Sequence, residues 1–139
     1  MFECIIYATD GSDHARKALA YARDLAKLHD AKLFVINAYP SVSDLLGYKE
    51  FDTVLARRLA DANKIIEEAG KELDLAGLTF QTELLEGPMA EAIINVAETR
   101  GADLIILGAR GMSSIEGLLL GSVSQKVIHH ATCPVLVVR

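Results

Sequence analysis

The chain has 139 residues, which is the size of one domain and leaves no room for a second hydrophobic core. Hydrophobic residues make up 51% of it and charged residues 24%, a balance that excludes a disordered chain. The formal net charge is −5, aromatic residues make up 6% and Trp is absent, so we expect no nucleic-acid partner: such a surface repels phosphates and offers no stacking platform.

The first half of the chain alternates between strand and helix patterns. An apolar run ends in the turn residues Asp10-Gly11-Ser12, as a strand followed by a turn does. Apolar residues then recur at helical spacing, and Ser12 or Asp13 is the expected N-cap of that helix. The predicted elements of this half are a strand at 3–9, a helix at 13–28, a strand at 32–38, a loop at 39–48 and a helix from about 51 to 73.

The second half continues the alternation. Residues 79–84 alternate between apolar and polar, which is typical of an edge strand, and Gly87-Pro88 is suited to open a helix. A nearly continuous apolar run at 103–107 predicts a strand buried on both faces. The elements that follow are a loop at 108–111, a helix at 122–130 and a last strand at 134–138.

Strict alternation of this kind predicts a single α/β domain over residues 1–139: an open parallel sheet of five strands with helices on both faces. The pattern does not give the strand order. In a doubly wound sheet the ligand crevice lies at the carboxyl ends of the strands, where the order reverses. If the first and fourth strands are central neighbours, their ends carry Asp10 and Gly108.

The segment after the fourth strand predicts an anion site. Gly108 and Gly111 remove side chains where the backbone leaves the strand, and Gly121-Ser122 does the same where the last helix begins. The free N–H groups and the positive dipole end of a helix N-terminus bind phosphate. Arg110 is the cation placed to approach that phosphate.

Two serines add to this interpretation, and one alternative stays open beside it. The hydroxyls of Ser122 and Ser124 would supply two further donors to phosphate oxygens. Ser122 followed by Gln125 also fits a capping box, which on its own explains both residues.

Asp10 is the second candidate site residue. A carboxylate at the end of the first strand can accept hydrogen bonds from ribose hydroxyls or hold a divalent cation. The alternative is a turn-forming Asp that bonds its own backbone. A carboxylate for a sugar facing a glycine-rich bend for phosphates suits a nucleotide.

One motif carries a resemblance to a known family. Gly108-x2-Gly111-x9-Gly121-Ser122 resembles, without a mismatch, the G-x2-G-x9-G-(S/T) ATP motif of the universal stress protein family. The resemblance covers essentially the whole chain. Its further matches are the segments Thr9-Asp10-Gly11-Ser12, Gly87-Pro88, 102–108 and 130–138.

The resemblance implies a fold, a ligand and a partner. The fold is like that of the adenine nucleotide alpha hydrolases, with strand order 3-2-1-4-5. The ligand is ATP, with AMP or ADP as alternatives and Mg or Mn as a possible divalent cation. The partner is a second copy, paired through the terminal strand at 134–138. The nucleotide-binding residues it implies are Ala8, Thr9, Asp10, Val35, Gly108, Arg110, Gly111, Gly121, Ser122, Val123 and Ser124. Ala109 departs from relatives that carry a side-chain donor there.

The sequence also bears on two other function classes. Efficient catalysis is not expected, since no Walker A lysine stands in the glycine loop. The histidines, His14 among them, have no metal-ligand spacing, and we expect them to be surface or helix-end residues. Slow ATP hydrolysis and a nucleotide-free dimeric interaction module stay open. Our preferred hypothesis is a nucleotide-dependent stress sensor.

We expect a cytoplasmic location without a membrane partner. Residues 1–6 lack the basic region and cleavage site of a signal peptide, and every apolar run is shorter than the ~18 residues that span a bilayer. Cys4 and Cys133 form no C-x-x-C pair and fall in predicted strands, so both thiols are expected to be buried and reduced.

Overall fold

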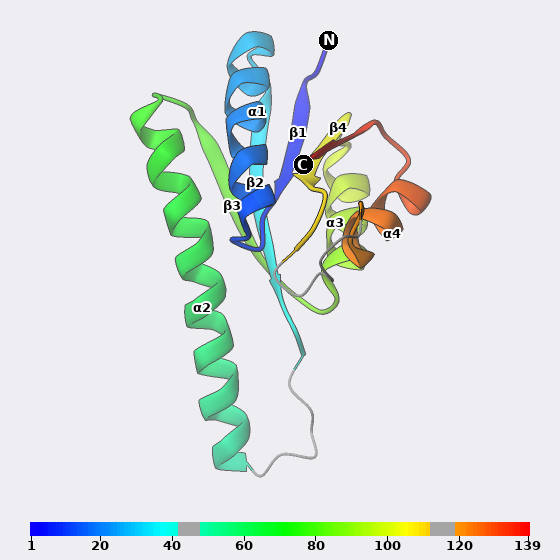
Figure 1. Ribbon diagram of the computed structural model, residues 1–139. Coiled ribbons are helices and arrows are strands. Elements are labelled where there is room, and N and C mark those ends of the chain that lie inside the picture. The colour runs from blue at the N-terminus through cyan, green and yellow to red at the C-terminus, as the bar shows by residue number, and fades with distance from the viewer. Residues whose placement is uncertain (42–47, 112–118) are drawn as a thin grey trace.

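The computed structural model describes residues 1–41, 48–111 and 119–139 of the chain. Five parallel strands form one sheet in the order β3-β2-β1-β4-β5, with helices on both of its faces (Figure 1). The elements are, in chain order, β1 (Cys4–Ala8), α1 (Asp13–His29), β2 (Lys32–Tyr39), α2 (Tyr48–Leu75), β3 (Phe80–Glu86), α3 (Met89–Arg100), β4 (Leu104–Gly108), α4 (Ser122–His130) and β5 (Val135–Val138).

The strand order confirms the order implied by the family resemblance. β1 lies at the centre of the sheet, where Tyr7 pairs with Val35 of β2 on one side and with Ile106 of β4 on the other. The chain runs outward from β1 to β3 on one side and from β4 to β5 on the other, so the order reverses between β1 and β4. A ligand crevice is expected outside the carboxyl ends of these two strands.

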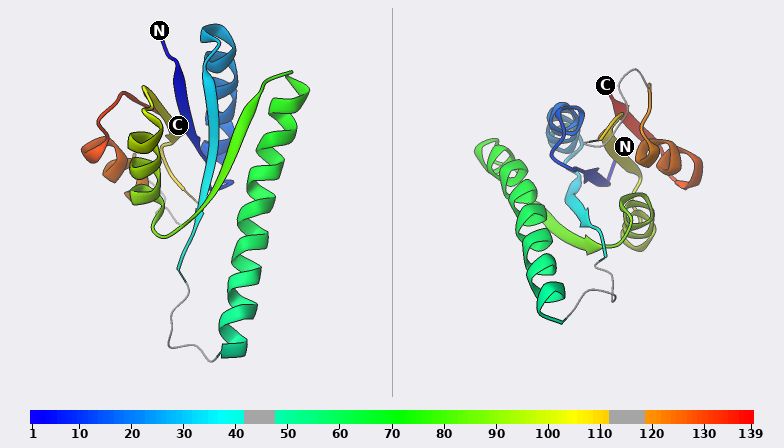
Figure 2. Two further views of the ribbon diagram at one scale, coloured as in Figure 1. Left: turned by 180° about the vertical axis from the view of Figure 1, so that it is seen from behind. Right: turned by 60° about the horizontal axis from the view of Figure 1, so that its bottom comes forward.

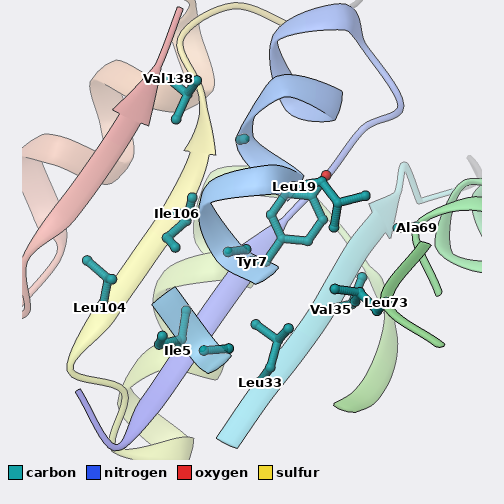
Figure 3. Packing of buried hydrophobic residues seen from close by; sticks show 13 residues of the cluster. Ile5, Tyr7, Leu19, Leu33, Val35, Ala69, Leu73, Leu104, Ile106 and Val138 are labelled. Carbon is teal, nitrogen blue, oxygen red and sulfur yellow. The ribbon is translucent and has the colours of Figure 1, made fainter. Parts of the chain in front are cut away.

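Two hydrophobic layers hold the sheet between the helices. α1 and α2 cover one face and α3 and α4 cover the other (Figure 2). Side chains of β1 alternate between the layers: Ile5 and Tyr7 pack toward α1, and Ile6 packs toward α3. The unbroken apolar run of β1 follows from this burial on both faces. Figure 3 shows the first layer, in which Ile106 and Leu19 lie beside Tyr7.

Tyr7 is the polar member of that layer. Its side chain is 1% exposed, and its hydroxyl donates a 2.7 Å hydrogen bond to the carbonyl oxygen of Ala15 in the first turn of α1. Burial, which disfavours the phenolate, raises the pKa of Tyr7 to about 12. The bond therefore ties the start of α1 to the centre of the sheet.

The observed elements differ from the predicted ones mainly at their ends. α2 begins at Tyr48 and ends at Leu75, so it is longer than the helix predicted for 51–73. β3 occupies Phe80–Glu86 rather than 79–84, and it is an edge strand as predicted. Residues 42–47 of the predicted loop lie outside the described residues. No helix in the described ranges is long and apolar enough to cross a bilayer.

Candidate functional site

A cavity of about 190 Å³ opens at the carboxyl ends of β1, β2 and β4 and at the N-terminus of α4. Its position is the one that the strand order predicts for a ligand crevice. Part of its lining is apolar, and all but one of these residues belong to the hydrophobic layer under α3 and α4: Ala8, Ala38, Met89, Ile93, Leu107 and Val123. The opposite end is polar and is lined by Asp10, Ser12, Arg110, Gly111, Gly121 and Ser122.

The ends of β1 and β4 meet at this polar end. A Cβ atom added to Gly111 would lie 2.5 Å from Oδ2 of Asp10, so the carboxylate stands directly against the glycine. The other oxygen of Asp10, Oδ1, accepts a 2.9 Å hydrogen bond from the backbone N–H of Ser12. Asp10 therefore forms the turn with Oδ1 and also lines the cavity, since the two oxygens of a carboxylate can serve different partners.

Gly108 is required by the packing of α1. A Cβ atom at this position would lie 2.7 Å from the backbone nitrogen of Ala15 and 2.8 Å from the carbonyl carbon of His14. Backbone atoms cannot yield at that distance, so any side chain at 108 would push α1 off the sheet. The first glycine of the motif thus has a structural explanation that involves no ligand.

Gly121 has no such explanation. It is buried at the N-cap of α4, with φ −82° and ψ 173°, which any residue adopts. A Cβ atom there would lie 3.4 Å from Cα of Arg110 and 3.6 Å from the backbone nitrogen of Gly111, which are ordinary contacts. The described fold would therefore accept alanine at 121. What glycine provides is a backbone without a side chain between the bend and the first N–H groups of α4.

The structure corrects the capping-box alternative for Ser122. Gly121 is the N-cap of α4 and no side chain caps it, so Ser122 is the first helical residue. The hydroxyl of a residue at this position does not make the capping bond, and Ser122 is exposed at the polar end of the cavity. The capping box therefore does not account for Ser122 and Gln125.

Ser124 lines the cavity in a different way from the one expected. Its hydroxyl is buried and lies 2.7 Å from the carbonyl oxygen of Ala109 and 3.0 Å from that of Gly121, both within donor reach. The backbone N–H of Gly121 also donates to the carbonyl oxygen of Ala109, at 2.7 Å. The hydroxyl of Ser124 thus holds the bend against the helix, and it is not free to donate to a phosphate without giving up these bonds.

A second hydroxyl connects the two strand ends. Ser12 is the N-cap of α1, as one of the two sequence alternatives had it, and its Oγ accepts from the backbone N–H of Ala15 at 3.4 Å. The same hydroxyl donates to the carbonyl oxygen of Arg110 at 3.3 Å. It therefore links the start of α1 to the bend that follows β4.

Thr9 and Val35 do not line the cavity. Thr9 is buried; its backbone N–H donates to the carbonyl oxygen of Ile36, and its Oγ1 accepts from the N–H of Gly11. Val35 is fully buried in the sheet, where it pairs with β1 and β3. On β2 the lining positions are Asn37 and Ala38, which follow Val35 toward the carboxyl end of the strand. The adenine contact expected of Val35 stays a prediction.

His14 reaches the site through a lining residue, a contact that the sequence did not reveal. Its Nε2 lies 3.1 Å from Nη2 of Arg110, which lines the cavity, whereas His14 itself does not. Burial, and next to it the positive charge of Arg110, lower the pKa of His14. A histidine in the first turn of a helix carries no sequence signal for such a contact, because the contact depends on how closely α1 approaches Gly108.

The described part of the chain holds no group of three or more His, Cys, Asp or Glu side chains that could bind a metal ion. Asp10 is the carboxylate that these residues bring to the cavity. A divalent cation at this site would therefore need most of its ligands from a bound anion and from water.

Comparison with known proteins places the whole chain in one group. Residues 1–139 match the model of the universal stress protein family. The protein named "Universal stress protein in QAH/OAS sulfhydrylase 3'region" from Thermus aquaticus is 46% identical over 140 residues, with both chains fully covered. The solved structure of universal stress protein UspA from Lactobacillus plantarum has a TM-score of 0.89 at 26% identity, covering 99% of this chain and 97% of that one. A universal stress protein solved in complex with cAMP has a TM-score of 0.77 at 29% identity and covers 99% and 97%.

Proposed function

Because the chain belongs to the universal stress protein family, we propose that it binds ATP in the cavity at the ends of β1 and β4 and acts as a nucleotide-dependent regulator. The observation that carries this proposal is Gly121, a buried glycine whose backbone conformation does not require glycine and which leaves bare backbone beside a helix N-terminus. Such a position is explained by an anion that approaches the backbone closely.

The phosphates would lie at the polar end of the cavity. The first N–H groups of α4 have no intrahelical acceptor, and the helix dipole favours negative charge there. Arg110 and Ser122 both line the cavity, so a guanidinium and the hydroxyl of an exposed serine would be within reach of a bound phosphate.

The sugar and the base would occupy the remaining lining. The carboxylate of Asp10 lies beside Gly111 and is suited to accept hydrogen bonds from ribose hydroxyls. The apolar wall formed by Ala8, Ile93 and Leu107 gives a flat base a nonpolar surface. The universal stress protein solved in complex with cAMP supports an adenine nucleotide as the ligand, since cAMP and ATP share the adenosine moiety.

A divalent cation, Mg²⁺ or Mn²⁺, fits this arrangement as a companion of the phosphates. Asp10 would supply one carboxylate, and phosphate oxygens and water would supply the rest. The ion would neutralise phosphate charge next to Asp10, which otherwise repels it.

The regulatory part of the proposal involves a second copy of the chain. β5 lies at the edge of the sheet, so one side of its backbone is open for pairing. Val135, Leu136 and Val137 are partly exposed along that edge. Pairing of two β5 strands across a two-fold axis would cover them and give a homodimer whose two cavities lie close to the interface.

The test is to identify what the purified protein carries. Heat denaturation followed by mass analysis of the released small molecules should yield ATP or another adenine nucleotide, and calorimetry on the stripped protein should show ATP binding with one site per chain. Steady ADP production well above background would favour a hydrolase. Absence of any nucleotide binding would refute the proposal and favour an interaction module.

A further inference from the structure

The contact between His14 and Arg110 sets a condition on both side chains. An arginine is always a donor, so at 3.1 Å the Nε2 atom of His14 must act as the acceptor. The ring is then neutral and carries its proton on Nδ1. That atom is buried, with no hydrogen-bond partner among the described residues. In this arrangement Nε2 has a hydrogen bond from Arg110, and Nδ1–H has no hydrogen-bond acceptor among the described residues.

The backbone and Cβ of His14 are packed closely against the end of β4. The Cβ of His14 would lie only 2.9 Å from a Cβ at residue 108, so the glycine lets the first turn of α1 sit directly on the end of β4. This packing brings the His14 side chain beside the bend, where its imidazole contacts Arg110, the second residue after β4. Arg110, in turn, is one of the residues that line the cavity.

We propose that His14 is a positioning residue for the nucleotide site: its neutral imidazole holds the Arg110 guanidinium at the phosphate end of the cavity, and protonation of the ring releases that guanidinium. The inference rests on the nucleotide-binding function proposed above. When the ring is protonated, Nε2 of His14 becomes a donor like Nη2 of Arg110, and both side chains carry a positive charge. The contact is then lost and Arg110 turns away toward solvent.

The charges around His14 agree with a neutral ring at neutral pH. Arg110, on the segment after β4, and Lys17, one turn along α1, both oppose its protonation; Asp13, at the start of α1, favours it. Burial opposes it more than any of these charges. The release of Arg110 therefore belongs to acid conditions, below the usual pKa of histidine, which is about 6.5.

The variants that test this proposal are His14→Gln and His14→Ala. The Oε1 atom of glutamine can accept from Arg110 but does not titrate, whereas alanine removes the acceptor. Calorimetric affinities for ATP are measured for the three proteins at pH 8.0 and pH 5.0, with circular dichroism at both pH values to show that each is folded. Adenosine, which has no phosphate, is the control ligand.

At pH 8.0, His14→Ala should bind ATP about tenfold more weakly than the wild type, the size expected when one contact to a charged group is lost, and His14→Gln should be within about threefold of it. On going to pH 5.0 the wild type should lose more affinity for ATP than His14→Gln, because only the wild type has a titrating side chain at position 14. Protonation of ATP itself affects both proteins equally and cancels in the comparison. Adenosine affinity should be unchanged in all three, whereas a merely structural defect would lower it.

The proposal is overturned if His14→Ala binds ATP as well as the wild type does. It is also overturned if acidification affects the wild type and His14→Gln equally, or strengthens ATP binding to the wild type relative to His14→Gln. In each of these cases the nucleotide site itself stands. If the wild type binds neither ATP nor adenosine at either pH, the proposed function fails and this inference fails with it.

Discussion

Replacing Gly121 with valine tests the feature on which the nucleotide site depends most directly. The Cβ of the new side chain would lie 3.4 Å from Cα of Arg110, which is an ordinary contact. Its two methyl groups would then fill the space between the bend and the first N–H groups of α4. A phosphate could no longer reach those groups, and the variant should lose the hydrogen bonds that they donate.

The loss can be estimated from the number of donors. Two N–H groups donating to a charged phosphate contribute about 1.5 kcal/mol each, or about 3 kcal/mol together. Since about 1.4 kcal/mol corresponds to a tenfold change, the dissociation constant for ATP should rise about 100-fold. Calorimetry at fixed pH and Mg²⁺ concentration measures this directly.

Two controls separate this effect from damage to the fold. Gly121→Ala adds only the Cβ that the structure accommodates, so its loss of ATP affinity should lie between those of the wild type and the valine variant. Thermal unfolding of the nucleotide-free proteins should differ by only a few degrees, because an N-cap substitution costs about 1 kcal/mol. Wild-type ATP affinity in Gly121→Val would show that the bend is not the phosphate site.

Three further predictions concern other parts of the molecule. Asp10→Ala should weaken ATP binding by about 1–2 kcal/mol in calorimetry, whereas Asp10→Asn, which keeps an acceptor for Ser12, separates loss of charge from loss of the turn. The buried phenol of Tyr7 stays protonated in the folded state at pH values where the same phenol ionises in the unfolded chain. The free energy of unfolding, measured with urea, should therefore fall by about 2–3 kcal/mol as the pH rises from about 10 to about 12. An equal fall in Tyr7→Phe would contradict this. In β5 the carbonyls of Pro134 and Val138 face β4, so the N–H of Val137 points to the other side of the strand, at the sheet edge. Val137→Pro removes that N–H and should convert a dimer to a monomer in light scattering. An unchanged mass would refute pairing through β5.

The layered fold was within reach of the sequence because its strongest signals are local. The apolar run of β1 and the helical spacing in α1 each reflect burial on particular faces, and both elements were found. The ends of α2 were missed because tertiary packing decides them, and propensity changes little between Tyr48 and Phe51. The strand order came from the family resemblance, since alternation alone does not distinguish one doubly wound order from another.

The candidate site was only partly predictable for the same reason. The motif located the bend, but it could not show that packing requires glycine at 108 whereas position 121 would accept a Cβ, because both positions carry the same residue. The hydroxyl of Ser124 was expected to be a free donor and instead lies in hydrogen-bond reach of two backbone carbonyls. His14 was interpreted as a helix-end residue, and its contact with Arg110 spans 96 positions of the sequence, which no local pattern reports.

The hydroxyl of Ser12 has a consequence for how occupancy of the cavity would be felt elsewhere. Since one Oγ both caps α1 and donates to the carbonyl of Arg110, fraying of the first turn of α1 and loosening of the bend share one hydrogen-bonding group. The N–H groups of Ala15 and Arg16 donate to Ser12, which also bonds to the bend. A ligand that stabilises the bend should therefore slow amide hydrogen exchange at Ala15 and Arg16. Exchange at α1 would then serve as a reporter of occupancy.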